Sequence, residues 1–239
     1  MKLDAIAIGA HPDDIELYVG GTLIKLAALG HRTGVVDMVR GELGTRGTPR
    51  LRAREAAASA KVLGISVREN LKLKDGQIFD TPEARLRVVK VLRKYRPELV
   101  FTHYWDDKHP DHVYTSRIVT QACYLAGLAK IETGQERFRP NKIFYFQLPY
   151  QVHPSFFVDV SAHFARKMEA LRCFKSQLFD PDSVEPETYL SVPQFLSAHE
   201  SMERYYGKLI QTDFAEAFYS KEPIGIEDPV EFFSKGGAK

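Results

Sequence analysis

Residues 6–14 of the 239-residue chain, IAIGAHPDD, decide its fold class, because an apolar run gives way at once to three ionisable side chains. Residues 6–9 have the composition of a buried strand, and His11, Asp13 and Asp14 follow directly. Burying charge is costly unless the charge is paired or bound to a metal. In open α/β sheets, ligands bind in the crevice at the carboxyl ends of the strands. The stretch therefore predicts a strand that delivers these side chains to a functional site.

Apolar runs of strand length alternate with segments of helical period over roughly the first 150 residues. This alternation predicts right-handed βαβ crossovers and an α/β fold, with a Rossmann-like, mainly parallel sheet and helices on both faces. We expect strands at 4–10, 33–39, 71–73, 98–103 and 142–148, and helices at 15–29, 52–63, 82–95 and 112–128.

The later residues predict a mixed C-terminal elaboration. It contains a strand near 156–160, a helix at 161–176, a loop at 180–187, a helix at 193–210 and an apolar finish at 214–219. No internal repeat, low-complexity tract or linker composition interrupts the sequence. We therefore expect residues 1–239 to form a single domain.

The composition of the chain indicates which classes of partner it binds and where in the cell it works. Lys and Arg number 33 against 31 Asp and Glu, which gives a formal charge of +2 and no general field to attract nucleic acid or a membrane. Cys123 and Cys173 lie far apart, which favours reduced thiols over a disulfide framework. The first apolar run is too short for a signal peptide, and none approaches the roughly 20 residues of a membrane helix. We expect a cytoplasmic protein with a small-molecule partner and no nucleic-acid or membrane partner.

A second polar cluster, His109-Pro110-Asp111-His112, follows the strand expected at 98–103. If the first and fourth strands are neighbours, as in the Rossmann order, the two clusters face each other. A catalytic zinc takes three protein ligands and leaves one position open. His11 and Asp14 lie three residues apart on a turn that enters a helix, and His112 can supply a third ligand.

The remaining residues of the two clusters suit catalysis. Asp13 is positioned to take a proton from water activated by the metal, and His109 can stabilise an oxyanion or protonate a leaving amine. Asp111 or Asp107 can orient the imidazole of His109. Each cluster taken alone is equally typical of ordinary turns and helix caps. Fe²⁺, Co²⁺ or Ni²⁺ would accept the same ligands as Zn²⁺.

Two further features have both a functional and an ordinary interpretation. The segment after residue 39 is rich in arginine and glycine, which suits a carboxylate or phosphate ligand but also a solvated loop. Its arginines are Arg40, Arg46, Arg50, Arg52 and Arg54. Asp75 follows the third expected strand, although Asp-Gly is also a common turn. Neither a Walker A motif nor a strand-linked G-x-G-x-x-G motif is present, so nucleotide binding lacks its usual signature.

The pair GAHPDDIEL and HPDHV resembles the two-part signature of the PIG-L/LmbE-like zinc-dependent N-deacetylases. The stretches RGELGTRGTPRLRAREAAASAKVLGI, LKDGQI and KSQLFDPDSVEPETYLSVPQFL are similar to the bacillithiol-biosynthesis branch, whose members deacetylate N-acetylglucosaminyl-malate. This resemblance extends to about residue 223. Tyr18 and Val19 depart from it, because relatives commonly carry small residues there.

The resemblance implies a role for each site residue. The zinc ligands are His11, Asp14 and His112; the catalytic residues are Asp13 as general base, His109 as the stabiliser of the tetrahedral intermediate and Asp111 as its orienting partner. Arg52, Asp75 and Tyr189 match substrate-binding positions, Tyr189 being near where a mobile tyrosine occurs in some relatives. Several relatives form hexamers, so the resemblance also implies a homo-oligomer.

The activity expected on these grounds is hydrolysis of an N-acetyl group by metal-activated water, most specifically on N-acetylglucosaminyl-malate. One alternative is another acetylamino sugar, such as a chitin-derived disaccharide, or the amide of a thiol conjugate. An alternative of another class is a non-catalytic module that binds a sugar or nucleotide in the same crevice. Asp13 and His109, which are not needed as ligands, favour an enzyme over such a module.

Overall fold

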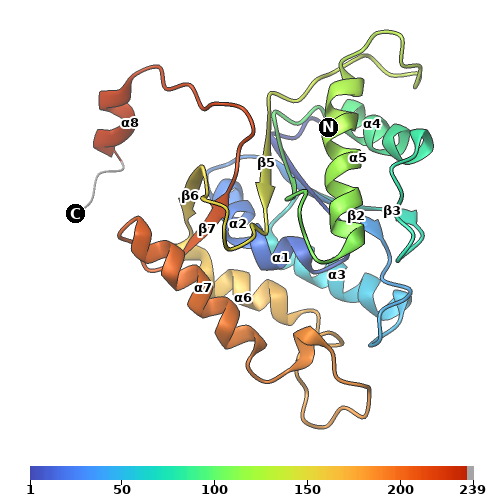
Figure 1. The fold of residues 1–239 in the computed structure, drawn as a ribbon, viewed down its shortest axis with the longest axis vertical. Helices are drawn as coiled ribbons and strands as arrows, with labels where there is room; N and C mark the ends of the chain where they lie inside the picture. The colour runs from blue at the N-terminus through green and yellow to red at the C-terminus, as the bar shows by residue number, and fades with distance from the viewer. Residues whose placement is uncertain (236–239) are drawn as a thin grey trace.

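Five parallel strands form the central sheet of the computed structural model, which describes residues 1–235 (Figure 1). They are β1 (Ala5–Gly9), β2 (Thr33–Val39), β3 (Val67–Leu73), β4 (Leu99–His103) and β5 (Lys142–Phe146), in the order β3-β2-β1-β4-β5. The order reverses between β1 and β4, which pair in parallel with Ala5 opposite Leu99. The expected neighbourhood of the first and fourth strands is therefore confirmed.

Helices cover both faces of this sheet because alternate strand residues point to opposite sides. Ile6 and Ile8 pack in a core with α4 (Pro82–Tyr95) and α5 (Pro110–Ala126). Ala5 and Ala7 belong to a second core that includes Ile15 and residues of α2 (Gly20–Ala28). A further helix, α3 (Pro49–Leu63), packs against α6 (Phe164–Arg172). The predicted α/β fold class is confirmed.

The last third of the chain forms the mixed elaboration expected from its sequence. Strands β6 (Phe156–Asp159) and β7 (Ala215–Phe218) pair antiparallel in a small second sheet. Between them come a short turn at Ser161–His163, α6, a second short turn at Tyr189–Ser191 and α7 (Phe195–Leu209). Helix α8 (Pro229–Lys235) lies apart from the rest of the fold (Figure 1). Across residues 1–235, none of the helices combines the length and apolar character of a membrane span.

The prediction of one continuous helix over 15–29 is wrong, because the helix breaks at Val19 into α1 (Asp14–Tyr18) and α2. A new helix start exposes backbone N–H groups that need acceptors. The amides of Gly21 and Thr22 each donate to the carboxylate of Glu216, at 2.8 Å. Gly21 is required by the close approach of the residue after β6, since a Cβ there would lie 2.8 Å from the side chain of Val160.

Smaller differences concern element ends. The third strand begins at Val67, four residues before its predicted start, because its polar residues 68–70 pair as an edge strand. The helix expected at 161–176 becomes a short turn followed by α6, which ends at Arg172.

A buried charge cluster joins the C-terminal elaboration to the break between α1 and α2. Lys167 of α6 is completely buried, and its Nζ lies 2.7 Å from Glu216 and also contacts Glu203 of α7. Both carboxylates are buried as well. Although burial alone would lower it, these two carboxylates raise the pKa of Lys167. The lysine charge is what allows two carboxylates to share this interior.

Replacing Lys167 by Met tests the energetic weight of this cluster. The substitution leaves two buried carboxylates without the ammonium group that they share, so we expect the free energy of unfolding to fall by about 3–5 kcal/mol, the usual cost of breaking a buried ion pair. Urea denaturation followed by circular dichroism measures the change. Lys208→Met, at an exposed position of α7, is the control and should change stability by less than about 0.5 kcal/mol. Equal stability of the two variants would contradict this account.

Candidate metal centre

The polar clusters meet at the carboxyl edge of the sheet, where the strand order reverses. Residues 10–14 follow β1, and residues 109–112 form the start of α5 after β4. Pro110 occupies the first turn of α5, and His109 caps it by accepting the backbone N–H of Asp111. The helix start thus fixes the direction in which His112 projects. The predicted meeting of the two clusters is confirmed.

His11, Asp14 and His112 place their donor atoms together. One donor atom from each residue lies within 4.8 Å of the donor atoms of the other two, and all three residues are largely buried. Asp14 lies between the imidazoles: Oδ2 is 3.5 Å from Nδ1 of His11, and Oδ1 is 3.5 Å from Nε2 of His112. Two imidazoles and one carboxylate are a donor set that suits Zn²⁺ and other divalent transition metals.

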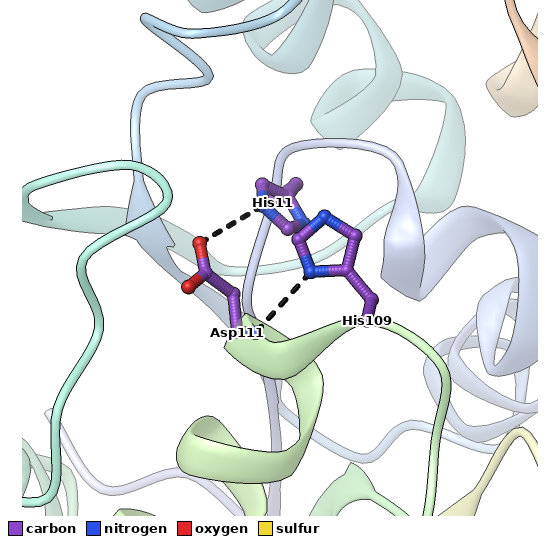
Figure 2. Close-up of side chains that lie close together, drawn as sticks. All are labelled: His11, His109 and Asp111. Carbon is purple, nitrogen blue, oxygen red and sulfur yellow. Dashed lines mark hydrogen bonds and ion pairs between the residues drawn. The ribbon is translucent and has the colours of Figure 1, made fainter.

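Donor atoms of a second group also lie within 4.8 Å of one another, those of His11, His109 and Asp111 (Figure 2). Its carboxylate is already engaged, since Asp111 accepts the backbone N–H of Gly76 at 2.8 Å and lies 3.5 Å from Nε2 of His11. The ring of His109 is exposed and receives the backbone N–H of Asp111 on Nδ1 at 3.2 Å. Asp111 therefore contacts His109 through its backbone, while its carboxylate faces His11. The group with Asp14 is the better candidate for a metal because all three of its residues are largely buried, whereas His109 is exposed.

Asp107 orients His112 from the side away from Asp14. Its Oδ1 lies 3.3 Å from Nδ1 of His112 and accepts the backbone N–H of His109 at 2.7 Å. A carboxylate on one imidazole nitrogen directs the other nitrogen toward a metal and increases its basicity. The sequence predicts a contact of Asp107 with His109 alone, whereas the structure brings Asp107 to both His109 and His112.

His103 is a site residue that the sequence clusters did not include. It is completely buried at the end of β4, and its ring stacks on that of His112 with centroids 4.1 Å apart. Its Nε2 accepts the backbone N–H of Ala10 at 3.0 Å, which ties β4 to the start of the first cluster. Burial and the neighbouring His112 lower the pKa of His103 to about 4, so its ring is neutral at neutral pH. Its position at the end of the fourth expected strand predicts that His103 lies near the site, and the structure places it there.

The two aspartates of the first cluster, Asp13 and Asp14, differ in the direction in which their pKa values shift. Burial raises the pKa of Asp13 to about 7, against the opposing effect of Arg52. Despite burial, His112 holds the pKa of Asp14 well below its usual value. Asp14 is therefore a permanent anion suited to a cation, while Asp13 titrates in the range that a general base needs.

The backbone of Asp13 is strained. Its φ of 115° lies in the left-handed region that residues other than glycine rarely occupy. Such outliers concentrate at functional sites, where the surroundings hold them in place. Here Arg52 contacts both sides of the turn, with Nη2 donating to the backbone oxygen of Pro12 and to Oδ2 of Asp13 at 3.0 Å.

The three predicted substrate-binding residues lie in different surroundings. Arg52 is buried, with its guanidinium engaged by Asp13. Asp75 lies beside the candidate metal ligands, with Oδ1 3.3 Å from Nε2 of His11 and Oδ2 accepting the backbone N–H of Leu43. Tyr189 is 81% exposed on its short turn, where its ring contacts Phe195. The structure thus brings Arg52 and Asp75 to the cluster and leaves Tyr189 at the surface.

The sequence is similar to those of known deacetylases. Residues 6–123 match the family model described as PIG-L, GlcNAc-PI de-N-acetylase. The chain is 30% identical over 224 residues to the diacetylchitobiose deacetylase of Thermococcus kodakarensis, covering 88% of this chain and 80% of that protein.

Solved structures agree with the sequence relatives. The conserved protein TT1542 of Thermus thermophilus superposes with a TM-score of 0.86 at 37% identity, covering 95% of this chain and 98% of that one. The N,N'-diacetylchitobiose deacetylase of Pyrococcus horikoshii superposes with a TM-score of 0.78 at 25% identity, covering 90% and 82%. The chain belongs to the PIG-L family and is a metal-dependent N-deacetylase.

Proposed function

We propose that the chain removes the N-acetyl group from an N-acetylglucosamine derivative, using His11, Asp14 and His112 to hold a divalent metal, Zn²⁺ first among the candidates. The observation that carries this proposal is Asp13, a strained and buried carboxyl with a pKa near neutrality, next to a cluster of three metal donors. A related deacetylase that acts on diacetylchitobiose supports the sugar class.

The chemistry divides between the metal and the side chains around it. When bound, the divalent ion supplies Lewis-acid chemistry, polarising a carbonyl and making water more acidic. Asp13 takes the proton of the attacking water, and Arg52 holds the Asp13 carboxylate in place. The neutral ring of His109 accepts the Asp111 amide on Nδ1, so its proton resides on Nε2. That N–H is available to a developing oxyanion, and the proton that Asp13 takes from the water would pass to the departing amine as the C–N bond breaks.

Among acetylated sugars, we propose N-acetylglucosaminyl-malate, the substrate of bacillithiol biosynthesis, as the preferred one. Its two carboxylates match the loop between β2 and α3, which carries Arg40 and Arg46, and the sugar hydroxyls match Asp75 beside His11. A neutral disaccharide of the diacetylchitobiose type is the alternative that the relatives favour. A comparison of acetate release from the two substrates separates them, and a preference for the neutral sugar would exclude the malate conjugate.

Replacing Asp13 by Ala tests the base. We expect metal content to be retained and turnover to fall by roughly 10²–10⁴-fold, the usual contribution of a general base. Acetate release and metal analysis of the purified variant measure the two effects. Full activity of Asp13→Ala would exclude Asp13 as the base.

Removal of the metal tests the ligand set. We expect a chelator to abolish acetate release and added Zn²⁺ to restore it, because both the water and the carbonyl need the cation. His112→Ala should lose the metal itself, since only two of the three donors remain. Undiminished activity in a chain shown to be free of metal would contradict the proposal.

Asp107→Asn tests the orientation of His112. We expect affinity for Zn²⁺ to fall by about 10–100-fold, the usual effect of losing a carboxylate behind a ligating histidine. Competition with a chromophoric chelator measures the affinity. Asp106→Asn, at the exposed neighbouring position, is the matched control and should leave the affinity unchanged. Equal affinities for the two variants would remove Asp107 from the site.

A further inference from the structure

Arg46 is a buried cation without a matching hydrogen bond. It lies in the loop between β2 and α3, is 4% exposed, and its Nε has no hydrogen-bond partner. The nearest carboxylate oxygen, Oε2 of Glu185, lies 3.7 Å from that nitrogen, which is an ion pair but not a hydrogen bond. A buried guanidinium Nε–H without a hydrogen-bond acceptor is costly, so this N–H group favours an anionic ligand that approaches more closely than Glu185 does.

The surroundings of Arg46 form a site for one carboxylate. The backbone N–H of Gly47 donates to Oε1 of Glu185 at 3.0 Å, so the amide and the guanidinium address the two oxygens of the same group. Gly47 has a φ of 73°, and a Cβ there would lie 2.8 Å from Oγ of Ser176. The conformation that points this amide outward is therefore available only to glycine at this position.

Glu185 is a replaceable occupant. It belongs to the loop between α6 and α7, its side chain is 44% exposed, and its own amide is bonded locally to Ser183. Partly exposed ion pairs contribute little to stability, so another carboxylate can displace this one at low cost. The chain thus fills with its own side chain a site whose geometry suits a free acid.

The Arg46 site adjoins the metal centre. Three residues earlier in the same loop, the amide of Leu43 donates to Asp75, which lies 3.3 Å from His11. The position of a Cβ on Gly44 lies 3.4 Å from Nη1 of Arg52 and 3.6 Å from the backbone oxygen of Arg46. The loop therefore runs from Asp75 past the Arg52–Asp13 pair to Arg46.

We propose that Arg46 and the amide of Gly47 bind the carboxylate of an acidic substituent on the acetylamino sugar, displacing Glu185. This rests on the proposed function and adds to it the residue that selects acidic over neutral sugars. Arg52 is held by hydrogen bonds from Nη2 to Asp13 and to the backbone oxygen of Pro12, although its Nε, like that of Arg46, has no hydrogen-bond partner within residues 1–235. The acidic substituent is assigned to Arg46 because Arg46 faces a displaceable carboxylate.

Binding of the reaction products tests the site without requiring turnover. The metal-loaded chain is titrated in a calorimeter with glucosaminyl-malate and with methyl glucosaminide, which lacks the acid. We expect the wild type to bind the acidic ligand more tightly, and Arg46→Met to weaken that ligand by about tenfold or more, as expected for loss of a charge-assisted hydrogen bond. The neutral ligand should bind Arg46→Met within about twofold of wild type, because it never reaches the site.

Two further variants complete the experiment. Arg50→Met removes an equal charge at an exposed position in the first turn of α3 and should alter neither affinity. Glu185→Gln removes the charged competitor and should tighten binding of the acidic ligand alone. Equal weakening of both ligands by Arg46→Met, or no change in either, would overturn the proposal. Absence of acetate release from any sugar by the wild type would instead refute the proposed function, while these titrations still decide the role of Arg46.

Discussion

The parallel pairing of β1 with β4 is the contact on which the metal centre depends. It sets Ile8 opposite Thr102, so both strands end at the same level of the sheet. The backbone N–H of Ala10 then reaches the ring of His103, and His103 stacks on His112. The backbone pairing of β1 with β4 brings together residues about one hundred positions apart, and the contacts of His103 then stabilise this arrangement. A slip of this register would separate the two clusters.

Charge is tolerated at this edge because each ionised group has a defined counterpart. Asp14 is surrounded by imidazoles, Asp13 by the guanidinium of Arg52, and Asp75 by His11 and a backbone amide. A metal bound among the first group adds positive charge where carboxylates already outnumber fixed cations. The same logic recurs at Lys167, where a single ammonium group serves two carboxylates. In both places a pair is stable only while its partner is present.

Much of this could be predicted from the sequence, because the signals are local. The apolar runs, the prolines at the starts of α3, α4 and α5, and the two polar clusters after strands each depend on residues a few positions apart. The parallel sheet and the meeting of the clusters follow from the alternation of strands and helices.

What could not be predicted depends on contacts between distant residues. The break at Val19 is stabilised by Glu216, which is 195 positions from Gly21. The different roles of Arg46 and Arg52 also depend on distant residues. Both arginines lie in one basic segment, but in the folded chain Arg52 pairs with Asp13 and Arg46 faces Glu185. Composition alone treats these two arginines as equivalent.

The Glu216 cap has a consequence for the order of events during synthesis. The segment that carries His11, Asp13 and Asp14 is synthesised well before β7, yet the amides at the start of α2 find their acceptor, up to 195 positions away, only when β7 has been made. Contacts of such long sequence separation form late and slow folding. A nascent chain therefore exposes metal-binding side chains long before their supporting structure exists. A metal held in the final geometry of this site would therefore be acquired only after β7 has been made and has paired with the start of α2.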